Sequence, residues 1–421
     1  MQNINRRKFG LLACAGIAAI ANPYTTSAQS KPRVVIIGGG AGGASAARSL
    51  AQDKGLDVTL VSASDTYTSC FFSNLYLGGF RDFNSITHSY DNLAADGVTV
   101  VTGFASGVDR NSKTVSLQDG SSLTYDRLIV APGISFNYDS VPGYTESDAE
   151  TAPHAWQAGT QTQLLKAKLD AMQDGDSIVM VPPPNPYRCP PGPYERASMM
   201  AHVIKSRGFK NSQIIILDPK PKFSKQALFQ EGWEKHYPGM IEWYGPDVHG
   251  GIVNVDAKAG IVETDLDEFS GAVLNIIPQQ KAGSIAFAAG LTDDTGYCPI
   301  DATSMRSTID DNIFVIGDAS IAGAMPKSGF SANSQAKVAA LAIRNDLTGL
   351  SIDAAVYSNT CWSLIAADDG VKVGASYEAI DGKITSTSTF ISKPGESSEL
   401  RETTYLESLG WYSAISVDMF G

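Results

Sequence analysis

Five cysteines are the most reactive side chains in this 421-residue sequence: Cys14, Cys70, Cys189, Cys298 and Cys361. They are too few and too widely spaced for a disulfide scaffold, and no C-x-x-C pair indicates a zinc site. The chain also lacks the C-x-x-C-H sequence that attaches a c-type haem, so it cannot carry such a haem itself. A single cysteine is most often a small buried hydrophobic residue, so any chemical role must come from its surroundings.

Cys189 lies in a loop filled with prolines, P-P-P-N-P-Y-R-C-P-P-G-P. The segment 177–218 around it has the rhythm of a strand, a helix and a second strand. In a dinucleotide-binding unit of this kind, the loop would carry glycines that bind phosphate. Proline offers no N–H to a phosphate and stiffens the loop. We therefore expect the frame for NAD(P)H without its phosphate-binding loop, and a pyridine nucleotide is disfavoured as the electron donor.

Another strand–helix–strand unit is predicted over residues 31–62. Its turn contains Gly38, Gly40 and Gly43 in G-x-G-x-x-G spacing. Glycine in such a turn permits a tight bend, lets a pyrophosphate approach the backbone and allows close helix packing. The N-terminus of the following helix attracts the anion. This unit is therefore predicted to bind a dinucleotide.

Two later hydrophobic strands, predicted over 124–133 and 312–320, support this assignment. The second ends at Asp318, which is placed either to accept a hydrogen bond from a sugar hydroxyl or to cap a helix. FAD-binding folds commonly end their second strand with an acid for the adenosine ribose. Here that strand ends at Ser62, a weaker partner than a carboxylate, with Asp65 as a possible substitute. The three elements in this order resemble the FAD-binding segments of flavoproteins with two dinucleotide domains.

The predicted fold is therefore α/β, with two Rossmann-like domains of the disulfide-reductase flavoprotein kind and a small α+β domain at the C-terminus. The C-terminal segment contains alternating, strand-like stretches and no amphipathic basic helix for a membrane surface. The expected boundaries are 31–150 and 287–350 for the FAD-binding domain, 151–286 for the second Rossmann-like domain, and 351–421 for the C-terminal domain.

Residues 1–28 have the features of a twin-arginine export signal, with Arg6 and Arg7 as the pair and cleavage expected after Ala28. Removal of this segment leaves a net charge of −15, from 29 basic and 44 acidic residues, compared with −12 for the full chain. Such an acidic chain is not expected to bind nucleic acid. No other segment is long and apolar enough for stable membrane insertion. We expect a periplasmic protein that acquires a cofactor before export.

The sequence resembles the flavoprotein subunit of flavocytochrome c sulfide dehydrogenase over essentially the whole chain after the signal segment. Relatives in the sulfide:quinone oxidoreductase group share the fold and the general chemistry, whereas the proline loop and the export signal favour the flavocytochrome branch. The resemblance is carried by C-F-F-S-N (70–74), C-P-P-G-P-Y-E-R-A-S (189–198), G-Y-C-P-I-D (296–301), M-P-K-S-G-F-S-A-N-S-Q-A-K-V-A-A (325–340) and N-T-C-W-S-L (359–364).

The resemblance implies FAD as the cofactor and roles for three cysteines. It implies that the sulfur of Cys70 bonds covalently to the 8-methyl carbon of FAD, and that Cys189 and Cys361 form a redox disulfide over the flavin. Glu195 is then the candidate base that takes a proton from the substrate. Local alternatives remain: a buried thiol for Cys70, a purely structural bridge, and an ordinary first-turn acid for Glu195. Cys298 is left as a small buried hydrophobic residue.

The implied activity is the oxidation of sulfide to sulfur or polysulfide. Attack of HS⁻ on the bridge would give a persulfide on one cysteine and a thiolate on the other, which passes two electrons to FAD. The electrons must then leave to another chain, by resemblance a c-type cytochrome subunit in a heterodimer. The alternatives are a sulfide:quinone oxidoreductase-like enzyme that reduces quinone and a non-catalytic electron-transfer flavoprotein. The residues leave open which cysteine carries the persulfide.

Overall fold

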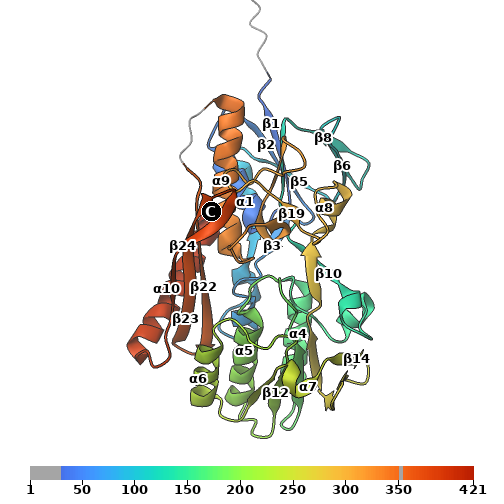
Figure 1. Ribbon diagram of the computed structural model, residues 1–421, viewed down its shortest axis with the longest axis vertical. Helices are drawn as coiled ribbons and strands as arrows, with labels where there is room; N and C mark the ends of the chain where they lie inside the picture. The colour runs from blue at the N-terminus through green and yellow to red at the C-terminus, as the bar shows by residue number, and fades with distance from the viewer. Residues whose placement is uncertain (1–29, 350–353) are drawn as a thin grey trace, which may run out of the picture. The chain divides into compact units, whose positions relative to one another are not determined.

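The structure, a computed structural model, describes residues 30–349 and 354–421. The predicted export signal, with Arg6 and Arg7, lies outside the described residues. From residue 32 onward the chain forms two parallel sheets and one large antiparallel sheet, with helices packed on them (Figure 1). The predicted α/β fold with two Rossmann-like sheets is confirmed.

The first sheet has five parallel strands in the order β20, β9, β1, β2, β5. Most of its strands are short runs of valine, isoleucine and leucine, as expected for a parallel sheet that is buried on both faces. The helices α1 (Ala41–Ala51) and α9 (Gly329–Thr348) share one hydrophobic core with this sheet. The strands are β1 (Arg33–Ile37), β2 (Asp57–Ser62), β5 (Thr99–Thr102), β9 (Arg127–Val130) and β20 (Ile313–Val315).

The second sheet has four parallel strands in the order β13, β12, β11, β17. The chain passes between the two parallel sheets along β10 (Ile134–Asn137) and β18 (Gln279–Ala282), which pair antiparallel. The proline loop joins the end of β11 to the start of α5. The elements of this part are β11 (Ser177–Val181), β12 (Gln213–Leu217), β13 (Ile241–Tyr244), β17 (Val273–Ile276), α4 (Thr160–Ala171), α5 (Gly192–Ser206) and α6 (Gln226–His236).

The C-terminal segment forms an antiparallel sheet followed by a long helix. The strands β22 (Val356–Ala366), β23 (Asp369–Ile380) and β24 (Lys383–Ile391) pair in order, and α10 (Ser398–Phe420) packs against them. The Ser397 hydroxyl accepts a hydrogen bond from the Leu400 N–H and so caps this helix. The antiparallel strands match the expected small domain, whereas a 23-residue helix is longer than the sequence pattern indicated.

Shorter elements connect these three parts. The short strands are β3 (Thr66–Thr68), β4 (Thr87–Ser89), β6 (Ala105–Asp109), β7 (Thr114–Leu117), β8 (Ser122–Thr124), β14 (Ile252–Asp256), β15 (Ile261–Thr264), β16 (Glu268–Ser270), β19 (Cys298–Pro299) and β21 (Ser320–Ile321). The short helices are α2 (Ser73–Leu77), α3 (Asp91–Ala95), α7 (Pro246–His249), α8 (Ser284–Ala288) and the 3-10 turns η1 (Phe83–Ile86), η2 (Tyr138–Ser140), η3 (Glu146–Glu150) and η4 (Gly317–Ala319).

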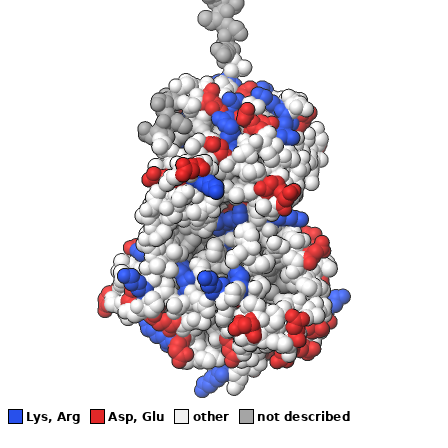
Figure 2. Space-filling model, in the orientation of Figure 1, with Lys and Arg blue, Asp and Glu red and all other residues white. Residues whose placement is uncertain are grey.

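The surface in view carries both signs of charge. Figure 2 shows a hollow across the middle of this face, with basic side chains along it and acidic groups on the surface above and below. Within residues 30–349 and 354–421, no helix combines the length and apolar character needed to cross a bilayer.

Candidate active site

The loop between β1 and α1 is packed too closely for side chains at two of the three predicted glycines. A Cβ on Gly38 would lie 2.2 Å from the carbonyl oxygen of Ala131, and one on Gly43 would lie 1.8 Å from the carbonyl oxygen of Gly38. Gly38 also has a φ of +104°, which favours glycine. The helix α1 starts after Gly40 with no side-chain cap, and its first residues line a cavity. This arrangement suits an anionic group at the helix N-terminus.

The cavity that starts at this loop extends to Cys70, Arg188 and Asp318. Asp318 is only 8% exposed, and its Oδ1 has no hydrogen-bond partner. Its Oδ2 lies 3.5 Å from Arg188 Nε, and Arg188 Nη1 lies 3.5 Å from Cys70 Sγ. Buried polar atoms are nearly always satisfied in proteins, so the free carboxylate oxygen indicates a ligand that donates a hydrogen bond. A sugar hydroxyl meets this requirement.

Ser62 also lines the cavity, but its hydroxyl is partly occupied by Tyr90. The two hydroxyl oxygens lie 3.0 Å apart, and Tyr90 donates its proton to the carbonyl oxygen of Gly39 at 3.0 Å. Ser62 therefore donates to Tyr90 and keeps only acceptor capacity for a ribose. Asp65 is exposed and, unlike its neighbours Ser64 and Thr66, is not among the residues that line the cavity. The expectation that Asp65 could replace Ser62 therefore gains no support and stays a prediction.

These residues fit FAD. The glycine loop and the start of α1 would hold the pyrophosphate, Asp318 would accept a hydrogen bond from a hydroxyl, and Cys70 also lines the cavity. All the predicted cofactor residues except Gly43 line this cavity; Gly43 instead allows α1 to pack closely on β1.

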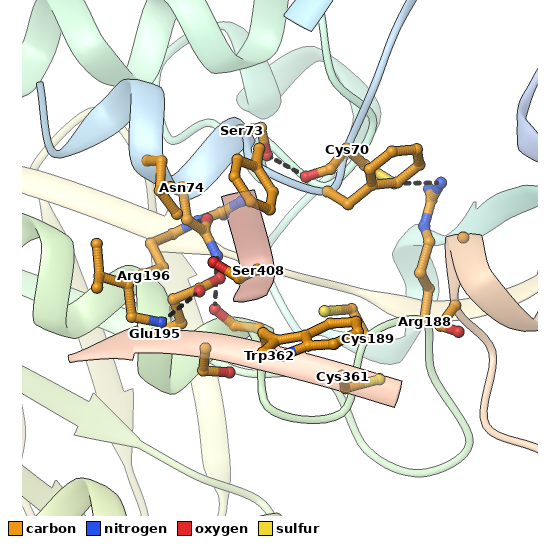
Figure 3. Close-up of a pocket in the computed structure, with 18 of the residues that line it drawn as sticks. Cys70, Ser73, Asn74, Arg188, Cys189, Glu195, Arg196, Cys361, Trp362 and Ser408 are labelled. Atoms are coloured by element: carbon orange, nitrogen blue, oxygen red, sulfur yellow. Dashed lines mark hydrogen bonds between the residues drawn. The ribbon is translucent and has the colours of Figure 1, made fainter. Parts of the chain in front are cut away.

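A second cavity brings the predicted catalytic residues together (Figure 3). Cys189, Cys361 and Glu195 all line it, although they come from the proline loop, from β22 and from α5. This cavity shares Cys70 and Arg188 with the first one. The two thiols are therefore placed next to the end of the candidate flavin site.

Cys189 is held in a left-handed backbone conformation with a φ of +56°. For a residue other than glycine this costs about 1 kcal/mol or more, and such strain is concentrated at functional sites. Two hydrogen bonds fix it: its N–H donates to the carbonyl oxygen of Lys327, and the Gly192 N–H donates to its own carbonyl oxygen, both at 2.8 Å. Burial raises the pKa of the Cys189 thiol well above its usual range, and Cys361 and Glu195 raise it further.

Cys361 lies in the middle of β22, where it pairs with Val373 of β23. Asn359 Nδ2 donates a hydrogen bond to Cys361 Sγ at 3.4 Å. Burial raises the pKa of the Cys361 thiol, while the Asn359 contact and the Lys225 ammonium act in the opposite direction. Both Cys189 and Cys361 are free thiols in the structure, so the implied disulfide is not formed there and the pairing stays a prediction.

Glu195 is oriented by a chain of hydrogen bonds that begins at a buried arginine. Arg196 is 1% exposed and its Nε donates to Asn74 Oδ1 at 3.1 Å. Asn74 Nδ2 then donates to Glu195 Oε2 at 2.8 Å, and the Leu364 N–H donates to Glu195 Oε1 at 2.9 Å. Removal from water raises the pKa of the Glu195 carboxyl, although these two hydrogen bonds partly offset the effect. A carboxyl with a raised pKa suits proton transfer near neutral pH.

Aromatic rings form the wall of this cavity on the C-terminal side. Trp362 of β22 stacks on Trp411 of α10, with ring centroids 5.1 Å apart, and Phe330 lies 5.9 Å from Trp411. The long helix α10 therefore contributes directly to the site.

In the second sheet, the carboxylate at the position that would bind a nucleotide ribose already interacts with other protein groups. Asp218 follows β12, where an acid binds the ribose in NAD-dependent Rossmann domains. It is fully buried and accepts hydrogen bonds from Tyr194 and Trp243, and Lys220 Nζ lies 2.6 Å from its Oδ1. Together with the proline loop, this network supports the expectation that NAD(P)H is not the electron donor.

Sequence reasoning missed three cations at or beside the site, the half-buried Arg188 and the buried Arg196 and Lys225. The two arginines flank a stretch of apolar and proline residues, which is a weak signal for burial; nothing in the sequence around Lys225 gives one. Cys298 lies outside both cavities, fully buried in a hydrophobic core, and burial raises its pKa to about 12. It has the surroundings of a small hydrophobic residue.

Three family descriptions match parts of the chain, two of which overlap over residues 162–181. Residues 162–278 match the central part of the sulfide dehydrogenase (flavocytochrome c) flavoprotein chain, and residues 353–420 match the flavocytochrome c sulphide dehydrogenase flavin-binding segment. Residues 32–181 match the pyridine nucleotide-disulphide oxidoreductases.

Curated relatives and solved structures agree with these matches. The mitochondrial sulfide:quinone oxidoreductase of Dictyostelium discoideum is 22% identical over 309 residues, 68% of this chain and 65% of the relative. The mouse enzyme is 20% identical over 69% of this chain and 66% of its own, so the match spans just under two thirds of both relatives.

Among solved structures, the sulfide:quinone oxidoreductase from Aquifex aeolicus superimposes with a TM-score of 0.73 at 17% identity, over 92% of each chain. This likeness shows the fold. Taken with the family matches on the central and C-terminal parts, it leads to one conclusion: the chain belongs to the family of flavoprotein subunits of flavocytochrome c sulfide dehydrogenase, which is related to the sulfide:quinone oxidoreductases.

Proposed function

We propose that this protein oxidises sulfide to sulfur or polysulfide in the periplasm and passes the electrons, through FAD bound covalently at Cys70, to a c-type cytochrome subunit. The observation that carries this proposal is the meeting of two cavities at Cys70. One has the residues for FAD, and the other holds Cys189, Cys361 and Glu195. The names of the matched families support sulfide as the substrate.

The chain's own residues perform the first chemical step. HS⁻ attacks one sulfur of a Cys189–Cys361 bridge, a new sulfur–sulfur bond forms, and the bond between the two cysteines breaks with its electron pair on the departing sulfur. Glu195, held by Asn74 and by the Leu364 N–H, accepts the proton of the substrate sulfur in its ionised form. FAD, when bound, supplies the capacity to accept an electron pair and to release single electrons.

The role of the thiol pair is tested by replacing Cys361 with serine. Sulfide-dependent bleaching of the flavin absorbance should then be lost, because no bridge can form. If the C361S protein still reduces its flavin with sulfide, the pair is structural and the protein is an electron carrier of another kind.

The electron acceptor is tested by comparing two acceptors with the purified protein. We expect faster reduction of a c-type cytochrome than of a short-chain quinone. The quinone is the second candidate because the curated relatives are named sulfide:quinone oxidoreductases. Comparable rates with quinone would exclude the cytochrome proposal.

The covalent bond is tested by denaturing the protein and measuring the mass of its peptides. Flavin should remain on the peptide that contains Cys70 and should be released from a C70S variant. FAD that dissociates freely from the wild-type protein would exclude the covalent bond but would not exclude the proposed activity.

The periplasmic location is tested by replacing Arg6 and Arg7 with lysine. The variant should stay in the cytoplasmic fraction of the host cell, whereas the wild-type chain should be found in the periplasmic fraction. Export of both proteins would exclude the twin-arginine route.

A further inference from the structure

Lys225 is a buried lysine beside the thiol pair that the sequence did not indicate. It stands immediately before α6, with a left-handed φ of +62°, and is 6% exposed. Its Nζ donates to the carbonyl oxygen of Cys361 at 3.1 Å and to Ser363 Oγ at 2.8 Å. The ammonium group is thus anchored on β22 on both sides of Trp362.

No carboxylate forms an ion pair with Lys225 among the residues that the structure describes. This distinguishes it from Lys220, which is equally buried but lies 2.6 Å from Asp218 Oδ1. Burial of a cation without a carboxylate partner is costly. Burial lowers the pKa of Lys225 to about 8, and the groups that counteract this are Cys361, Glu195 and Cys189, in that order. The Lys225 ammonium is hydrogen-bonded to the backbone of Cys361 itself, and Cys361 is the group that offsets the cost of its burial most.

The two cysteines differ in their hydrogen bonds. Asn359 Oδ1 accepts from Ser328 Oγ at 2.6 Å, which fixes the amide so that its Nδ2 points to Cys361 Sγ. In the described part of the chain, no such donor contacts the sulfur of Cys189. A thiolate at Cys361 therefore has both a hydrogen-bond donor and a nearby cation, whereas one at Cys189 lacks the donor.

We propose that Lys225 is a positioning residue that holds negative charge on Cys361, so that Cys361 leaves as the thiolate when the bridge opens and Cys189 receives the sulfur of the substrate. The step balances: HS⁻ and the bridge give a Cys189 persulfide and a Cys361 thiolate. The assignment of the persulfide rests on the proposed function; the charge preference of the reduced pair does not. The titratable groups around Cys361 are Lys225 before α6, Glu195 of α5, Cys189 of the proline loop and Tyr377 of β23.

The charge preference is measured without sulfide or an electron acceptor. The full flavin-loaded protein is reduced with a phosphine under argon and pulsed with iodoacetamide over a range of pH, and alkylation of each cysteine is followed by peptide mass. In the wild-type protein we expect the alkylation midpoint of Cys361 to lie below that of Cys189. A Cys189 midpoint below that of Cys361 overturns the proposal.

Three variants isolate the lysine. In K225M the midpoint of Cys361 should rise by about one pH unit, a roughly tenfold loss of thiolate at lower pH, because an opposite charge at close range is removed. K225R should restore the wild-type midpoint. K220M removes an equally buried lysine whose ammonium contacts Asp218 and the Pro183 carbonyl oxygen rather than Cys361, and it should leave the Cys361 midpoint unchanged. An unchanged Cys361 midpoint in K225M overturns the proposal, and the wild-type comparison above keeps it testable if K225M does not fold.

The persulfide assignment is tested separately with one equivalent of sulfide on the oxidised protein, followed by alkylation. The additional sulfur should be found on the peptide that contains Cys189. Additional sulfur on the Cys361 peptide overturns the assignment. If neither peptide gains sulfur, the proposed function fails while the charge preference is still measured.

Discussion

Asn74 controls the proton affinity of Glu195, and its replacement by alanine should change the pH dependence of the reaction. The structure gives Glu195 two donors, Asn74 Nδ2 at 2.8 Å and the Leu364 N–H at 2.9 Å, in surroundings that already raise its pKa. A hydrogen bond to a charged group contributes about 1.5–3 kcal/mol, and one pKa unit corresponds to about 1.4 kcal/mol. Because Glu195 keeps some exposure, we expect the lower end, a rise of about one unit in its pKa.

The assay is stopped-flow measurement of flavin reduction by sulfide as a function of pH. Glu195 must be ionised to accept a proton, so its activity is lost as the pH falls through its pKa. In N74A the acidic limb of the pH profile should therefore move to higher pH by about one unit. At pH values below the pKa of Glu195, flavin reduction should be about tenfold slower than in the wild-type protein. The ionisation of sulfide itself contributes equally to the pH profiles of the wild-type protein and of N74A, so it does not affect their difference.

A matched control is Asn333 of α9, a buried amide that also donates to a carboxylate, that of Asp418. N333A should leave the acidic limb in its wild-type position. Arg196 keeps three acceptors in N74A, on His154, Ala155 and Asn275, so the start of α5 should persist. A limb that stays in place in N74A, or moves to lower pH, would refute the role assigned to Glu195.

Further variants test the cofactor cavity and two cations at or beside the site. G43A should lose bound flavin, measured by the ratio of flavin to protein absorbance, because its Cβ would lie 1.8 Å from a backbone oxygen. G107A in β6, whose Cβ would meet no atom within 4 Å and which does not line the cavity, should retain it. R188M should destabilise the fold by about 1–3 kcal/mol in urea unfolding, since it removes the guanidinium 3.5 Å from the buried Asp318 carboxylate and leaves Lys327 as the nearby cation. A loss smaller than about 1 kcal/mol would contradict this ion pair. K225M should stabilise the fold at neutral pH by about 1–3 kcal/mol. Burial lowers the Lys225 pKa to about 8, so the wild-type protein bears the full cost of the buried charge below that pH. The cost disappears above the pKa of an unfolded lysine, where both states are neutral. Thermal unfolding should therefore show K225M to be more stable than the wild type at neutral pH but not in strong alkali.

The glycine loop could be predicted because its signal is local. A run of buried aliphatic residues, three spaced glycines and an alanine-rich helix all lie within residues 33–51, so composition and spacing define the unit. The position of Cys189 before α5 was predictable for the same reason. Local patterns do not show which residues of an exposed turn face a cavity: Ser64 and Thr66 line it, whereas Asp65, the suggested substitute for Ser62, is not among the lining residues.

The support around Glu195 could not be predicted, because it is assembled from distant segments. Asn74, Glu195 and Leu364 come from three different parts of the chain. The sequence also does not separate a buried cation such as Arg196 from the exposed lysines and arginines of an ordinary helix. Such contacts follow only once the sheets have brought the segments together.

The helix α10 was not evident because the first half of its buried face is polar. The residues that it buries follow helical spacing, but three of the seven are polar and all three precede Tyr412, so the pattern of hydropathy does not show the start of the helix. They are Arg401, Thr404, Ser408, Tyr412, Ile415, Met419 and Phe420.

The backbone is held much more firmly around Cys361 than around Cys189. Cys361 is in the interior of an 11-residue strand that is hydrogen-bonded along its length to β23, so its backbone is fixed by many neighbouring residue pairs. Cys189 is in a loop and is restrained chiefly by the two backbone hydrogen bonds to Lys327 and Gly192. Any change in the separation of the two sulfurs during a catalytic cycle therefore falls on the loop. Cys361 therefore stays in place on its strand while Cys189 moves with the proline loop. The prolines limit the directions in which this loop can move.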